Sequence, residues 1–84
     1  MQEFMRKFSQ LNGVQAKVTF EHYLFDKQRF YCSRLQMIDD DKRIGILLKG
    51  NEIFMYKQDV KVVETQDDVY KISDGRLTIN IKKL

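Results

Sequence analysis

Residues 43–64 read RIGILLKGNEIFMYKQDVKVVE, and this stretch carries the clearest strand pattern of the chain. Two apolar runs, at residues 44–48 and 53–56, flank Gly50 and Asn51. Glycine adopts positive φ without a Cβ penalty and Asn tolerates it, so this pair predicts a two-residue hairpin turn. A polar break at Gln58 and Asp59 then precedes the valine-rich residues 60–63. Because β-branched and aromatic residues crowd the stretch without helical spacing, it predicts three consecutive strands.

The N-terminal residues 1–12 have a different period. Apolar side chains recur there every three or four residues, which is typical of an amphipathic helix; they are Met1, Phe4, Met5, Phe8 and Leu11. Gly13 is a suitable residue to end it, since many helices close on a residue in the left-handed conformation. A lid across a sheet is the preferred interpretation, and a surface helix that meets a membrane or a partner is the alternative.

Between the helix and the central stretch, the sequence predicts two further strands. Residues 14–24 alternate apolar and polar positions, as a half-buried strand does. Residues 25–28 predict a polar turn. Residues 29–38 predict a second strand with apolar side chains on both faces, and we expect it to be covered on both sides.

The C-terminal residues predict a hairpin. A polar link at residues 65–68 is followed by β-rich runs at 69–72 and 77–81, which flank Ser73, Asp74, Gly75 and Arg76. Asp-Gly between two such runs is a strong hairpin signal. No proline, repeat or low-complexity segment marks a second domain, so the 84 residues predict a single small domain.

Residues able to carry chemistry are few and unpaired. His22 is interpreted as a hydrogen-bonded structural residue and Cys32 as a small buried hydrophobe, because neither has a catalytic partner by position. The three carboxylates at residues 39–41 lack the alternation and distal Glu of a calcium loop, and a solvated loop is preferred. We therefore expect neither an enzyme, nor a metal site, nor a cofactor.

Bulk properties set the remaining expectations. The 15 Lys and Arg residues exceed the 12 Asp and Glu residues, and the net charge of +3 is compatible with nucleic-acid binding without requiring it. A domain this short buries a limited core and is often stabilised by association, so a homo-oligomer is expected. The sequence predicts no membrane span and no secretory signal, which makes the cytoplasm the expected location.

The central stretch also resembles the Sm-like family, and in pattern the Hfq RNA chaperones. Leu47, Leu48 and Lys49 are similar to the LLKN-like strand of that family, and residues 60–63 to its ISTVV-like strand. Residues 55–58, Met-Tyr-Lys-Gln, stand where the family has a MVYKH-like motif, with Gln58 in place of the histidine. The resemblance covers residues 1–64.

The resemblance implies a fold, an assembly and a ligand. The fold is an N-terminal helix (1–12) capping a strongly bent, five-stranded antiparallel barrel (14–65), to which residues 69–84 add a further hairpin. The assembly is a ring in which the fourth strand of one subunit pairs with the fifth of the next. The ligand is single-stranded RNA, bound by Tyr56, Lys57 and Gln58 with help from Arg43 and Lys49. The alternative is a small β-barrel that mediates protein interaction or assembly without binding RNA.

Overall fold

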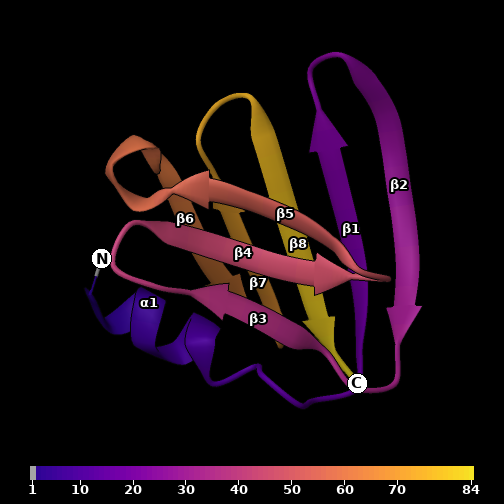
Figure 1. Cartoon of the computed structure of the whole chain (residues 1–84). Coiled ribbons are helices and arrows are strands. Elements are labelled where there is room, and N and C mark those ends of the chain that lie inside the picture. Colours follow the sequence, from indigo (N-terminus) through magenta and orange to yellow (C-terminus); the bar gives the residue numbers. More distant parts are fainter. Residues whose placement is uncertain (1) are drawn as a thin grey trace.

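A computed structural model describes residues 2–84 and is mainly β (Figure 1). One α-helix and one short 3-10 helix accompany the strands. In chain order the elements are α1 (Gln2–Ser9), β1 (Ala16–His22), β2 (Phe25–Cys32), β3 (Gln36–Asp39), β4 (Arg43–Leu48), β5 (Asn51–Tyr56), η1 (Lys57–Asp59), β6 (Val62–Gln66), β7 (Val69–Ser73) and β8 (Leu77–Lys83).

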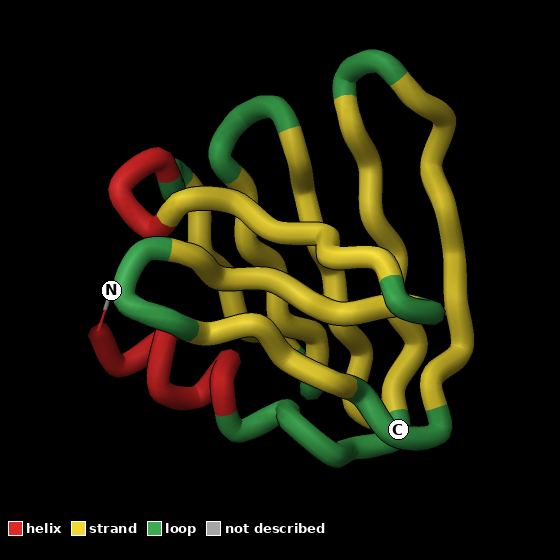
Figure 2. The backbone as a smooth tube through the Cα atoms, viewed as in Figure 1, coloured by secondary structure: helices red, strands yellow, loops and turns green. Residues whose placement is uncertain are grey.

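The strands form two antiparallel sheets (Figure 2). The larger sheet has the order β2-β1-β8-β7-β6, and the smaller has the order β3-β4-β5. In Figure 1 the smaller sheet lies across one face of the larger. The inward side chains of both sheets meet in one core, which contains Val18, Ile44, Ile46, Met55, Ile72, Ile79 and Ile81. The opposite face of the larger sheet is therefore its outer face.

The expected five-stranded closed barrel is wrong in its strand count and closure. Residues 2–84 contain eight strands in two separate sheets. To close five consecutive strands, the last must pair with the first. The β7–β8 hairpin occupies that place here, because β8 pairs with β1 and β7 pairs with β6. The C-terminal hairpin is thus in the middle of the larger sheet and is no appendage.

The predicted strand at residues 29–38 is two strands. It breaks at residues 33–35, where the chain leaves the larger sheet as β2 and enters the smaller sheet as β3. Leu35, in the break, is buried, and its N–H donates to the Val14 carbonyl at 2.8 Å. The expectation of cover on both sides is also wrong for β2, since Tyr31 on its outer face is 59% exposed. The apolar residues of 29–38 do not follow a single alternation because the chain passes from the larger sheet to the smaller sheet within this stretch.

Two predicted turns are displaced along the chain. The β4–β5 turn is formed by Lys49 and Gly50, with φ of 50° and 81°, and Asn51 already begins β5. The first hairpin turns at Tyr23 and Leu24, so residues 25–28, predicted as a turn, are in β2. The His22 ring holds that turn by accepting a hydrogen bond from the Leu24 N–H at 3.2 Å, consistent with a structural role.

Helix α1 lies against the edge strands β3 and β6, at one side of the two sheets (Figure 1). Its apolar side covers the core as expected for a lid: Phe8 is fully buried, and Phe4 and Met5 pack on the same cluster. The helix ends at Ser9, before the predicted end at residue 12, and Gly13, with φ of 86°, lies at the end of the turn that follows. Met1, assigned by sequence to the same side, lies outside the described residues. None of the described helices is long and apolar enough to cross a membrane.

Gly45 allows β4 and β5 to approach closely. A Cβ at this position would lie 2.1 Å from the Ile53 carbonyl oxygen and 2.5 Å from the Phe54 Cα, both backbone atoms. Real Cβ atoms do not approach backbone so closely, and the main chain cannot swing aside as the end of a side chain can. Any other residue here would therefore push the two strands apart, next to the segment that leads into Tyr56.

Candidate functional site

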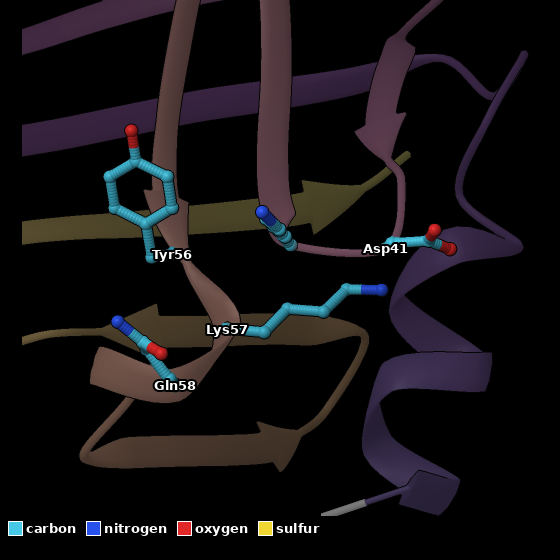
Figure 3. A pocket seen from close by; sticks show the side chains of 5 residues that line it. Asp41, Tyr56, Lys57 and Gln58 are labelled. Atoms are coloured by element: carbon cyan, nitrogen blue, oxygen red, sulfur yellow. The ribbon is translucent and has the colours of Figure 1, made fainter.

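Tyr56, Lys57 and Gln58 lie together where β5 passes into η1. The Lys57 N–H donates to the Lys42 carbonyl at 2.7 Å, and the Val60 N–H donates to the Lys57 carbonyl at 3.2 Å, which closes the turn. A hollow of about 380 Å³ is lined by these residues and by Asp41 and Lys42. In Figure 3 the Lys57 side chain runs toward the segment that carries Asp41, whereas the Tyr56 and Gln58 side chains point away from it.

Lys57 is held by a carboxylate that the sequence did not single out. Its Nζ lies 2.6 Å from Asp39 Oδ1, and the other oxygen of Asp39 accepts a hydrogen bond from the Ser9 hydroxyl of α1. Burial acts to raise the pKa of Asp39, but the hydrogen bonds from Lys57 and Ser9, with the charge of Lys57, outweigh it and leave the pKa below its ordinary value. The lid helix and Lys57 are thus linked through one ionised carboxylate.

Arg43, a predicted RNA contact, is directed to partners within the chain. Its Nε lies 2.7 Å from Asp40 and its NH1 lies 2.7 Å from Glu52. The guanidinium also lies 4.9 Å from the centre of the Phe54 ring, within the range of a cation–π contact. The hydrogen bonds from Arg43 and from nearby backbone N–H groups lower the pKa of Asp40 to about 2. Arg43 therefore stabilises the β3–β4 turn and the outer face of β5.

Lys49, the other predicted contact, is far from the hollow. It occupies the β4–β5 turn, at the opposite end of β4 from Arg43, which corresponds to roughly 20 Å at the usual rise per residue. Its Nζ lies 5.7 Å from the centre of the Phe30 ring. The nearby thiol of Cys32 is half-buried, and burial raises its pKa despite the opposing charge of Lys49. Neither group joins the Tyr56 hollow.

The structure adds Lys42, Asp41 and Asp39 to the site, although the sequence predicts a solvated loop for the two carboxylates. The predicted antiparallel hairpin of β4 and β5 could have indicated these neighbours. A hairpin whose turn is at residues 49 and 50 brings the residues just before Arg43 beside those just after Tyr56. Within residues 2–84 no group of three or more His, Cys, Asp or Glu side chains gathers as metal ligands would.

The chemistry of the hollow fits binding. Tyr56 is 48% exposed, so its ring is available to stack on a planar group. Lys42 and Lys57 supply ammonium groups, and Gln58 supplies an amide that both donates and accepts. Comparisons of the chain with family models, curated proteins and solved structures found no match.

Proposed function

We propose that the chain is a non-enzymatic, single-stranded RNA-binding protein of the Sm-like, Hfq-like type, which acts as a homo-oligomer. The observation that carries this proposal is that Tyr56, Lys57 and Gln58 line one open hollow, together with Lys42 and Asp41. An exposed aromatic ring stacks on unpaired bases, while ammonium groups hold the phosphates. The amide of Gln58 is suited to the polar edge of a base.

Free strand edges support the oligomeric part of the proposal. By position in the resemblance, β5 corresponds to the fourth strand of the family and β6 to the fifth, the two that pair between subunits. Each is the terminal strand of its sheet, and the C-terminal hairpin pairs only with the other side of β6. Neither outer edge is paired with another strand of the described chain, so each could pair with a strand of a neighbouring subunit by backbone hydrogen bonding.

The orientation of the backbone identifies which amides would pair. The Lys57 N–H points to β4 and the Lys61 N–H points to β7, as their hydrogen bonds establish. Since amides alternate along an antiparallel edge strand, that of Glu52 on β5 points outward. Glu52→Pro removes an outward amide and should shift the mass toward the 10.1 kDa protomer, whereas Glu52→Ala, which loses the same side chain but keeps the amide, should not.

Light scattering and fluorescence anisotropy test the proposal together. We expect a mass of several protomers and saturable binding of oligo-U, oligo-A or a mixed RNA. Lys57→Ala should reduce the log–log salt slope by about 0.7 per contact, and Tyr56→Ala should cost about 1–3 kcal/mol of binding energy. No saturable binding below about 100 µM, the weak end of non-specific association, contradicts the RNA function.

The second candidate is a protein-interaction or assembly module without RNA binding. It is favoured by the ion pairs that Arg43 and Lys57 make with carboxylates of the same chain. These pairs leave little excess positive charge at the hollow. An oligomer that binds none of the three RNAs supports this second function.

A further inference from the structure

The outer face of the five-stranded sheet carries a cluster of basic side chains. Strand pairing places Tyr31 of β2, Lys17 of β1 and Lys82 of β8 side by side in one row. The next row contains Arg29, Thr19, Asn80 and Lys71, in the order β2, β1, β8, β7. Further along the β1–β2 hairpin, Lys27 faces the same side. Alternate residues of these strands point into the core, so this set shares the solvent side.

This basic face, defined as Lys17, Lys27, Arg29, Lys71 and Lys82, accounts for the net charge of the protein. The only carboxylates on the same face of the described sheet are Glu21 and Glu64. Without these residues, the 15 basic and 12 acidic side chains of the chain are reduced to ten of each. The excess positive charge is thus concentrated on one surface.

Three of these cations have no carboxylate partner. Glu21 lies 3.5 Å from Lys27, and Glu64 lies at the far edge of the sheet, opposite Lys71. In the described part of the chain Lys17, Arg29 and Lys82 make no ion pair. Lys17 is moreover directly opposite Lys82 across β1 and β8, and like charges in that position repel. The sheet bears this cost without any compensating contact, as a site for an anionic ligand does.

The shape and the aromatic residue of the face specify the anion. A hollow of about 420 Å³ is lined by Lys17, Lys27, Arg29 and Lys82, and an adjoining one of about 280 Å³ by Tyr31. The Tyr31 hydroxyl accepts a hydrogen bond from the Gln15 side chain, which orients the ring while leaving it 59% exposed. A broad sheet surface cannot enter the deep, narrow major groove of duplex RNA, and an exposed ring stacks on unpaired bases, so the face suits an extended single strand.

We propose that the outer face of the five-stranded sheet is a second binding surface for single-stranded RNA, distinct from the Tyr56 hollow. Lys17, Arg29 and Lys82 contact the phosphates, and the Tyr31 ring stacks on a base. The ligand class rests on the proposed function, whereas the location rests on the residues of the face itself. An acidic protein segment would satisfy the cations but would make no use of the exposed ring.

The test compares two variants of equal charge. The face variant carries Lys17→Gln, Arg29→Gln and Lys82→Gln. The control variant carries Arg6→Gln, Lys7→Gln and Arg34→Gln, three exposed residues that line neither the Tyr56 hollow nor the hollows of the basic face. Each variant has the net charge of +3 reduced to zero, so they differ only in where the charge is removed. Binding of a labelled oligouridylate is measured by anisotropy between about 50 and 200 mM salt.

We expect the face variant to bind more weakly, with a log–log salt slope smaller by about 2, and the control to keep a slope near that of the wild type. Tyr31→Leu should weaken binding at least about fivefold. In urea without RNA, the face variant should be at least as stable as the wild type, because it loses the Lys17–Lys82 repulsion. A purely structural role for these residues predicts the opposite.

Three results would overturn the inference. If the face variant binds like the control while Tyr56→Ala loses affinity, the sheet surface is wrong and the proposed function stands. If polyglutamate of matched charge displaces the RNA as well as unlabelled RNA does, the face recognises acidic chains in general. If the wild type binds no RNA, the inference fails together with the proposed function.

Discussion

Replacing Asp39 by Asn should strengthen RNA binding, although the substitution lies beside the proposed contact and not in it. In the free protein the Lys57 ammonium lies 2.6 Å from the Asp39 carboxylate, so a phosphate that binds Lys57 must compete with that ion pair. The two side chains are 32% and 35% exposed, and ion pairs this accessible contribute about 0–1 kcal/mol. Because about 1.4 kcal/mol corresponds to a tenfold change, removing the competition should tighten binding by up to about fivefold.

The substitution is suited to this purpose because it leaves the rest of the link in place. The Asn side-chain oxygen can still accept the hydrogen bond that Ser9 donates from α1. With Lys57 released, the salt slope should also steepen by up to about 0.7. Fluorescence anisotropy with a labelled oligouridylate at two salt concentrations measures both quantities.

A matched control separates this effect from the general gain of positive charge. Glu3→Gln makes the same change in net charge on α1, where it releases Arg6 and Lys7 from exposed ion pairs away from both proposed surfaces. The reasoning is refuted if Asp39→Asn binds no more tightly than Glu3→Gln. It is equally refuted if the gain persists when Lys57 has already been replaced by Ala.

Four further outcomes are expected, and each has its own measurement. Gly45→Ala should lower the free energy of unfolding in urea by about 1–3 kcal/mol, since its Cβ would lie 2.1 Å from a backbone oxygen. Gly50→Asn, in open space with φ of 81°, should be tolerated, and equal urea midpoints for the two variants would contradict the close approach of β4 and β5. Phe8→Ala should lower the free energy of unfolding by about 3–5 kcal/mol because Phe8 is fully buried. Phe25 is 70% exposed, so Phe25→Ala should change it by less than about 0.5 kcal/mol. Similar losses in the two variants would contradict the assignment of α1 as a lid. The Asp40 carboxyl should titrate with a pKa of about 2 by NMR, and Arg43→Gln should move that pKa up toward 3.8. Because the folded pKa values of Asp39 and Asp40 lie below their unfolded ones, their stabilising effect is present above about pH 4 and is lost as the pH falls toward 2; a wild type as stable at pH 2 as at pH 5 would contradict the arrangement.

Local backbone chemistry explains which parts of the fold were predictable. Gly13 at φ of 86° ends the turn after α1, Gly75 at φ of 91° turns the last hairpin, and η1 lies at the polar break after β5, so the sequence located each of these interruptions. At Asp74 the carboxylate accepts hydrogen bonds from two turn amides, those of Arg76 and Leu77, as Asx-type turns do. These features depend on a few adjacent residues and need no knowledge of distant partners.

Strand partners were not predictable in the same way. Alternation in residues 14–24 and 77–81 shows that each has a buried face, but it does not show that β8 pairs with β1 along the whole of its length. The same limit applies to the site. Arg43 contacts Glu52 only because β4 and β5 pair in one hairpin. Lys57 contacts Asp39 only because β3 pairs with the other side of β4. Cations assigned to RNA from sequence were therefore satisfied by carboxylates whose proximity is a tertiary property.

The β7–β8 hairpin, which lies between β6 and β1, also has consequences for assembly. By taking the place between β6 and β1, β7 and β8 leave β5 and β6 each with one unpaired edge, joined by the short turn that carries Lys57 and Gln58. Pairing of β5 with β6 of the next subunit is a head-to-tail contact, which closes into a ring or extends into a filament. Exposed charges on an edge strand limit unspecific extension, and here Glu52 and Glu64 lie on the two edges, with Glu52 tied to Arg43. A pairing that brings these two strands together must accommodate both carboxylates, so the register that separates them is the one we expect an assembled form to adopt.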